Sequence, residues 1–390
     1  MECSQKRGSG NGNPDREIPG SHVSCSQDAG CEREYHAGRL AEFTVEPPDQ
    51  TVYQKVLDNW DRIAKPLDGM GKFERITAQI GAILGTGDID LVKKAVIIMC
   101  ADNGIVEEGV SQSGQEVTRA VAAQMGKGAS SVCRMASFLG ADTVPIDIGI
   151  NCTDPIPGVL AKKIRRGTRN FRKEPAMTES EAVRAIFTGI ETVFACKEKG
   201  YQILAIGEMG IGNTTTSSAV TAALLQCDVE TVTGRGAGLD DEKLLHKRQV
   251  IAEALTRYRL TGADPLLILQ TVGGLDIAGL TGVCIGGALY HIPIVLDGVI
   301  SMSAALLAEK IVPGTVRYLI PSHKGREPAV EKLIKALHSE PVIAADMALG
   351  EGTGAVMMLS LLDMALCIYQ GKTSFSDMEI EPYERYLKKI

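Results

Sequence analysis

The chain has 390 residues, of which 44 % are apolar, 23 % charged and only 4 % aromatic, with 42 glycines and one tryptophan. This composition is typical of a globular protein and excludes a chain that is disordered throughout. The formal net charge of −7 argues against a nucleic-acid-binding surface, and we find no apolar run that approaches the length of a membrane span.

Residues 1–48 are rich in Gly, Ser, Asn and charged residues, and we expect them to form a disordered extension. The first twenty residues lack the apolar segment of a secretory signal, which predicts a cytoplasmic protein. The ten cysteines form no CxxC pair, a pattern that favours free thiols in a reducing compartment. A zinc site at Cys25 and Cys31 is the alternative, and their spacing is not that of a tetrahedral site.

Helical patterns stand at both ends of the remaining chain. Apolar residues recur at helical spacing over residues 49–83, interrupted by a turn at 65–69, with a helix resuming over 73–84. The last helical pattern covers residues 354–369. These helices therefore flank a central region of different character.

In that central region, short apolar runs alternate with helical patterns. The runs cover residues 94–100, 143–148, 202–207, 293–297 and 315–320. The helical patterns cover residues 116–139, 179–199, 215–225, 242–258 and 301–309. Continuous apolar runs are typical of strands buried on both faces, and their alternation with helices predicts an α/β fold. We expect a parallel, Rossmann-like sheet flanked by helices.

Nearly every predicted strand leads into a small, polar loop that contains glycine. These loops cover residues 101–104, 147–151, 207–215, 296–298 and 321–325. Turns of α/β proteins need glycine in any case, but that need does not explain the accompanying Asp, Glu, Asn and His residues. Because ligands bind beyond the carboxyl ends of parallel strands, the loops predict one shared site.

The loop at residues 207–215, GEMGIGNTT, joins a predicted strand to a predicted helix. Such a loop offers backbone N–H groups to an anion, and Asn213 and Thr214 add donors. Binding of a mononucleotide phosphate and plain capping of the helix are equally supported. A second glycine-rich loop precedes a helix that carries Lys243 and Lys247 one turn apart. Either lysine could reach a phosphate, or both could lie on a solvated face.

Two carboxylates next to glycines are candidate acid–base groups. Glu351 stands between glycines before the last helix, where it either stabilises the helix start or acts as a general base. A base needs a raised pKa, which apolar neighbours such as Met209 and Leu349 would supply. Glu208 is a second carboxylate of this kind, and two such acids suit proton transfer beside a developing sugar cation. His323 is either a base or a donor that orients its loop.

Six motifs in this order resemble those of the nicotinate-nucleotide–dimethylbenzimidazole phosphoribosyltransferase family. They are GEMGIGNTTTSSAV, GRGAGLDD, GGLDIAGLTG, VLDGVISMSAAL, PSHKGREPA and LGEGTGA. The resemblance covers residues from about 53 to 369. It implies transfer of ribose 5-phosphate from nicotinate mononucleotide to 5,6-dimethylbenzimidazole or a similar base. The products would be α-ribazole 5′-phosphate and nicotinate, in assembly of the cobalamin nucleotide loop.

The resemblance also implies an organisation. A small helical domain formed by residues 49–90 and about 354–390 would stand beside a large catalytic α/β domain over 91–353. The family is homodimeric and uses no metal and no organic cofactor. Neither a nucleic-acid partner nor a membrane partner is expected.

Roles follow for residues at matching positions. Glu351 is implied to be the base, and Glu208 to stabilise positive charge on the sugar or to assist proton removal. The implied nucleotide- and phosphate-binding residues are Gly210, Asn213, Thr214, Lys247, Asp297 and Gly298. The residues implied for the base pocket are Ser113, Met209 and Leu349.

The sequence departs from the family pattern at Asn103, Ala237 and Ala348, where His, Thr and Arg are often found. These departures leave the preferred base open. The alternative functions are a nucleoside phosphorylase or nucleotide hydrolase, and a related phosphoribosyltransferase that uses adenine or phenolic bases. A mononucleotide sensor without activity is a further alternative.

Overall fold

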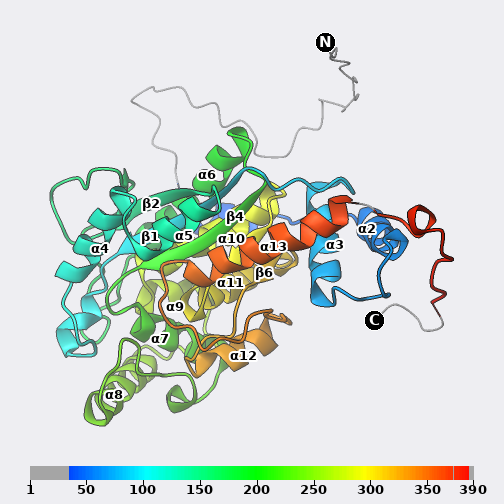
Figure 1. Cartoon of the computed structure of the whole chain (residues 1–390). Helices are drawn as coiled ribbons and strands as arrows, with labels where there is room; N and C mark the ends of the chain where they lie inside the picture. Colours follow the sequence, from blue (N-terminus) through cyan, green and yellow to red (C-terminus); the bar gives the residue numbers. More distant parts are fainter. Residues whose placement is uncertain (1–34, 372, 386–390) are drawn as a thin grey trace. The chain divides into compact units, whose positions relative to one another are not determined.

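The computed structural model describes residues 35–371 and 373–385 (Figure 1). Within these residues, six parallel strands form one sheet in the order β3-β2-β1-β4-β5-β6. The strands are β1 (Lys94–Ala101), β2 (Asp142–Gly149), β3 (Leu160–Ala161), β4 (Ile203–Met209), β5 (Ile294–Leu296) and β6 (Leu319–Pro321). The strand order reverses between β1 and β4, the kind of position at which open α/β sheets bind ligands. The predicted Rossmann-like fold is confirmed.

Four of the five predicted strands are present as β1, β2, β4 and β5, but the run at 315–320 is mostly a 3-10 turn. This turn, η3 (Thr315–Tyr318), precedes the short strand β6. The Glu309 carboxylate accepts hydrogen bonds from the backbone N–H groups of Gly314 (3.1 Å) and Val316 (2.8 Å), which holds the chain in the turn. The edge strand β3 is exposed and only two residues long, so it carries no apolar run.

The helices at both ends and most of the central helices lie where the sequence predicts them. They are α2 (Gln50–Arg62), α3 (Lys72–Leu84), α6 (Glu179–Glu198), α7 (Asn213–Leu225), α8 (Asp241–Arg257), α11 (Val299–Ile311) and α13 (Thr353–Gly371). The helices that were not predicted are α1 (Ala37–Ala41), α9 (Pro265–Val272), α10 (Leu275–Leu289) and α12 (Ala329–Ala336).

The single helix predicted over 116–139 is wrong, because the chain forms two helices there. They are α4 (Glu116–Gly126) and α5 (Ser131–Phe138). Gly128 adopts a positive φ of 69° between them, and the Ser130 hydroxyl accepts the N–H of Cys133 to cap the second helix. A glycine followed by a capping serine is thus the local signal that the helical spacing concealed.

The sheet is covered by helices on both faces, and β1 shows how its residues divide. Ala95, Ile97 and Met99 pack into one cluster with α6, α7, α9, α10 and α11, whereas Val96 and Ile98 pack with α2, α3, α4, α5 and α13. Successive side chains of a strand point to opposite faces, so a strand between two helical layers is apolar throughout. The core therefore lies on both sides of the sheet.

Two apolar helices belong to this core. Residues 275–288 of α10 are all buried, which removes the amphipathic period that predicts a helix. Helix α13 has 19 residues and, by length and composition alone, is long enough and apolar enough to cross a membrane, which corrects our expectation from apolar runs. Half of that stretch is buried against the protein through side chains such as Met358 and Leu362, as in a core helix.

Helices near both ends of the chain pack together on one side of the sheet. Figure 1 shows α13 crossing the sheet with its C-terminal end toward α2 and α3. The rings of Trp60 and Tyr369 lie 5.1 Å apart between centroids, and the Asn59 amide donates to the Tyr369 hydroxyl at 3.0 Å. Helical segments from both termini thus pack together, while the boundaries of a separate small domain stay a prediction.

Residues 35–48 differ from the disordered extension that the sequence predicts over 1–48. Leu40 is buried, the Tyr35 hydroxyl donates to the Glu191 carboxylate at 2.7 Å, and the Tyr318 hydroxyl donates to the Glu46 carbonyl at 2.7 Å. These contacts tie the segment to the α/β core. The rest of that prediction, with Cys25 and Cys31, lies outside the described residues.

Candidate active site

A cavity of about 330 Å³ opens at the carboxyl ends of β4, β5 and β6. Residues 207–211, 297–301, 323 and 325–327 line it together with residues 347–351, which precede α13. Three of the five predicted loops therefore meet at one site. The loops at 101–104 and 147–151 do not line the cavity, although Asn103 lies directly beneath Gly210.

Glu351 enters the cavity from a tight turn. Gly350, Glu351 and Gly352 all have positive φ values, of 83°, 61° and 98°. A Cβ on Gly207 would collide with the Glu351 carbonyl, so the turn packs directly on the end of β4. A glutamate in the left-handed region is costly, and such strain is typical of functional positions.

The Glu351 carboxylate is half-buried and weakly held. Its Oε2 atom accepts one long hydrogen bond, 3.4 Å, from the backbone N–H of Val132. Burial raises the pKa of Glu351, and the nearby Asp297 carboxylate raises it further. A raised pKa and a single weak partner leave this carboxylate free to take a proton, as a general base requires.

Asp297 follows β5 and holds the turn that carries Glu351. Its carboxylate accepts the backbone N–H groups of Gly354 at 2.8 Å, Ala355 at 3.2 Å and Gly352 at 3.2 Å. Burial raises the pKa of Asp297, and His323 together with these three donors lowers it. The contacts are with protein backbone, and binding of nucleotide by Asp297 stays a prediction.

Glu208, the second predicted carboxylate, lies next to this turn. Its Oε1 atom is 3.1 Å from the position that a Cβ on Gly350 would occupy, and the Asn213 amide donates to its Oε2 atom. Burial raises the pKa of Glu208 well above its usual range, and the carboxylates of Asp276 and Asp297 add to this effect. Several acids without an equal number of cations make the cavity electrostatically suited to a positively charged group.

The loop between β4 and α7 brings backbone into the cavity, as predicted. A Cβ on Gly210 would lie 2.5 Å from the Ala101 carbonyl oxygen and 2.6 Å from the Asp276 carboxylate, so only glycine fits there. Helix α7 begins at Asn213, and Thr214 lines the cavity at the positive end of this helix. The N-cap residue of α7 is Gly212 and no side chain caps the helix, so the loop leaves the start of α7 as a surface for an anion.

Lys247 is fully buried on α8 and does not line the cavity itself. Its Nζ atom donates to the Thr214 hydroxyl at 2.9 Å and to the Gly234 carbonyl at 3.2 Å. Burial lowers the pKa of Lys247 to about 8. Its charge therefore acts on the cavity through Thr214, whereas Lys243 is exposed to solvent.

The apolar side of the cavity contains two of the three predicted base-pocket residues. Met209 and Leu349 line it together with Val121 and Met347. Leu349 is 56 % exposed at the mouth, which is unusual for a leucine that serves only the core. Ser113 does not line the cavity.

His323 and Arg326 line the cavity from the segment after β6. The sequence had predicted no role for Arg326. The His323 Nδ1 atom lies 2.9 Å from the Ser322 hydroxyl, while Nε2 faces the backbone of Gly298 across the cavity wall. Arg326 is exposed, and among the described residues no hydrogen bond or ion pair occupies it. The PSHKGREPA motif was the available signal, but its residue spacing does not reveal which side chain reaches the cavity.

The comparisons give the class of enzyme to which this site belongs. Residues 45–380 match the model of a family described as phosphoribosyltransferase. The chain is 44 % identical over 336 residues to the nicotinate-nucleotide–dimethylbenzimidazole phosphoribosyltransferase of Clostridium acetobutylicum, covering 86 % of this chain and 96 % of that protein. The protein of the same name from Ruminiclostridium cellulolyticum is 43 % identical over 331 residues, covering 85 % of this chain and 94 % of the relative.

A solved structure agrees with these relatives. The crystal structure of CobT from Thermus thermophilus has a TM-score of 0.81 and 36 % sequence identity, and the match covers 85 % of this chain and 100 % of that one. The chain belongs to the nicotinate-nucleotide–dimethylbenzimidazole phosphoribosyltransferase family, which confirms the resemblance seen in its six motifs.

Proposed function

We propose that this protein transfers ribose 5-phosphate from nicotinate mononucleotide to 5,6-dimethylbenzimidazole or a similar base, in assembly of the cobalamin nucleotide loop. The observation that carries the proposal is the placement of Glu351 and Glu208 in one cavity, both with raised pKa values. The family membership and the high identity to curated relatives support the same reaction.

The chemistry requires one bond exchange and one proton transfer. A ring nitrogen of the benzimidazole attacks C1′ of the ribose while the bond from C1′ to the pyridinium nitrogen breaks. The bonding electron pair leaves with nicotinate, which thereby becomes a neutral pyridine ring. The other ring nitrogen of the benzimidazole loses its proton to Glu351.

The acidic lining of the cavity favours the cationic species in this reaction. The sugar carbon gains positive charge as the pyridinium departs, and Glu208 beside the Gly350 turn is in place to stabilise it. Charge that is fixed before the reaction costs no reorganisation at the transition state. A cation near Glu208 also favours the ionised form of that carboxyl, which burial otherwise disfavours.

The phosphate needs positive groups along the cavity wall. Thr214 with Lys247 behind it supplies one, and the exposed guanidinium of Arg326 supplies another. The nucleotide could approach the backbone closely at three further lining residues, Gly210, Asn213 and Gly298. The flat base would lie against Met209 and Leu349.

Product analysis tests the proposal. The protein is incubated with nicotinate mononucleotide, with and without 5,6-dimethylbenzimidazole, and the products are identified by mass spectrometry. We expect α-ribazole 5′-phosphate and nicotinate only when the base is present. Release of ribose 5-phosphate without base would indicate a hydrolase, and absence of turnover with any base would favour a nucleotide sensor.

We further propose that the protein is a cytoplasmic homodimer and that α13 contributes to the interface. Met357, Met364 and Ile368 are exposed and recur at helical spacing along one face of this helix. We expect size-exclusion chromatography with light scattering to give a dimer that Met364→Lys weakens. Leu245→Lys, on an exposed apolar residue of α8, is the matched control and should leave the dimer intact.

A further inference from the structure

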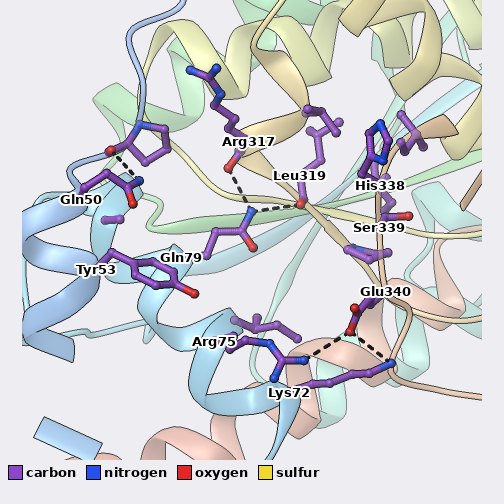
Figure 2. Close-up of a pocket in the computed structure, with 17 residues that line it drawn as sticks. Gln50, Tyr53, Lys72, Arg75, Gln79, Arg317, Leu319, His338, Ser339 and Glu340 are labelled. Carbon is purple, nitrogen blue, oxygen red and sulfur yellow. Dashed lines mark hydrogen bonds and ion pairs between the residues drawn. The ribbon is translucent and has the colours of Figure 1, made fainter. Parts of the chain in front are cut away.

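A second cavity, of about 440 Å³, lies between α3, the β6 edge of the sheet and the segment that follows α12 (Figure 2). It shares no lining residue with the catalytic cavity. Its apolar lining comes from side chains that include Ile76, Leu296, Leu319 and Leu337. The proposed reaction makes no use of this space.

The polar rim of this second cavity is positively charged. Lys72 and Arg75 lie one turn apart at the start of α3, and Arg317 adds a third cation. Glu340 is the only carboxylate among the lining residues, at 3.3 Å from Arg75 and 3.8 Å from Lys72. In a chain with a net charge of −7, this local excess of cations favours an anionic ligand. The start of a helix is also its positive end, which adds to the attraction.

Two further side chains define the interior. The Gln79 amide donates to the carbonyl groups of Arg317 at 2.9 Å and Leu319 at 3.2 Å, and so fixes α3 against the edge of the sheet. Figure 2 shows the Tyr53 ring directed toward the same space from α2. A flat apolar body between these walls would contact a tyrosine ring and aliphatic side chains.

Glu340 shows how the rim binds a carboxylate. Its side chain is 65 % exposed and stands on the short link between α12 and residue 343, so it can leave its two partners without disturbing the core. Exposed ion pairs contribute little free energy, and a competing carboxylate with an apolar body would gain burial in addition. Lining and rim together therefore fit a small aromatic carboxylate.

The segment that carries Glu340 is hydrogen-bonded to the residues on either side of His323. The backbone N–H groups of Val342 and Ile343 donate to the Ser322 carbonyl at 3.1 Å and 3.0 Å. The Lys324 N–H in turn donates to the Ile343 carbonyl at 2.9 Å. These bonds hold the chain on both sides of His323, which lines the catalytic cavity.

We propose that this second cavity is a regulatory site for a small aromatic carboxylate, which displaces Glu340 and loosens the backbone around His323. The nicotinate released in the reaction proposed above belongs to this chemical class. On the basis of that proposed function, the site would let product weaken the binding of nucleotide. The coupling requires the carboxylate to bind more tightly when Glu340 is displaced than in the arrangement described above.

Binding of benzoate, measured by calorimetry on the full chain, tests the site without relying on turnover. Glu340→Gln removes the internal competitor and should bind benzoate more tightly than the wild type, by about threefold. Lys72→Ala/Arg75→Ala removes two cations of the rim and should weaken the binding of benzoate by about fivefold or more. Lys243→Ala, which removes an exposed lysine of α8, is the control and should bind as the wild type does.

The opposite signs expected for the two variants cannot arise from a general loss of folding, which melting curves will check. Equal benzoate affinity in all four proteins would overturn the proposal.

In kinetic assays, benzoate should raise the KM for nicotinate mononucleotide in the wild type more than in Lys72→Ala/Arg75→Ala. An equal increase in both would mean that benzoate acts only in the catalytic cavity, which also contradicts the regulatory role. Absence of turnover in every protein would count against the proposed function and leave the binding result to stand by itself.

Discussion

The Asp297 carboxylate accepts the backbone N–H of Gly354 at 2.8 Å and thereby joins the end of β5 to the first turn of α13. The same carboxylate also accepts hydrogen bonds from the backbone N–H groups of Gly352 and Ala355. Glu351 directly precedes these three donors in the chain, and it has a positive φ that an unsupported glutamate rarely adopts. Asp297 is therefore a positioning residue for the proposed base.

Asp297→Asn should lower kcat by about tenfold or more, because an amide in this place leaves backbone donors without an acceptor. A lost buried hydrogen bond costs about 1–3 kcal/mol, so the melting temperature should fall as well. Asp264→Asn is the control, since Asp264 caps α9 by accepting from Leu266 and Leu267 away from the cavity. If both variants lose stability but Asp297→Asn keeps its kcat, the positioning role is wrong.

Arg326→Ala should raise the KM for nicotinate mononucleotide by about tenfold, the effect expected for one lost charge-assisted hydrogen bond. Nicotinate riboside lacks the phosphate and should show no such change, whereas nicotinamide mononucleotide, which lacks only the carboxylate, should behave like the full substrate. Steady-state kinetics on the three substrates measures this. Lys324→Ala removes a neighbouring cation outside the cavity lining and serves as the control. A uniform effect on all three substrates would argue against recognition of phosphate.

Activity should fall on the acidic side at a higher pH than an ordinary glutamate would cause. The base must be ionised to accept a proton, and burial raises the pKa of Glu351, so protonation removes the active form earlier as pH falls. The pH profile of kcat should thus rise to a plateau through a pKa above 4.5, the usual value for this carboxyl. A profile that stays flat down to that value would contradict the assignment.

On the basic side, the KM for the nucleotide should increase above a pH of about 8. Burial lowers the pKa of Lys247 to about 8, so its charge is present below that pH and is lost above it. Without the charge, Thr214 loses the cation behind its hydroxyl and the phosphate is held less tightly. The KM for nicotinate riboside, which lacks the phosphate, should not show this increase, and an equal increase would rule out Lys247 as its cause.

The fold could be predicted from the sequence wherever a short continuous apolar run or an amphipathic period marks an element. Strand β1 is apolar because both of its faces are buried, and α2 shows the amphipathic spacing of a helix packed on one side. Helix α10 was missed because burial on all sides removes the period. The turn η3 was missed because a distant carboxylate, Glu309, holds it, and such a contact leaves no local pattern.

The site was predictable as far as motifs mark it. Glu208, Glu351 and the loop before α7 lie together because parallel strands bring their carboxyl ends to one edge. The indirect placement of Lys247 behind Thr214 depends on how α8 packs, which residue spacing does not encode. The same holds for Arg326, because tertiary packing decides which side chains of the segment after β6 line the cavity.

Turnover of 5,6-dimethylbenzimidazole by Glu351→Gln, measured together with the Kd for nicotinate mononucleotide, tests most directly whether Glu351 is the base. Removal of a general base lowers the rate by about 10²- to 10⁴-fold. The Kd for nicotinate mononucleotide should stay within about twofold of the wild-type value. As a control, 1-methylbenzimidazole has no N–H proton to lose, so its turnover should be equal in the wild type and in Glu351→Gln. Near-wild-type turnover of 5,6-dimethylbenzimidazole by the variant would contradict the role assigned to Glu351.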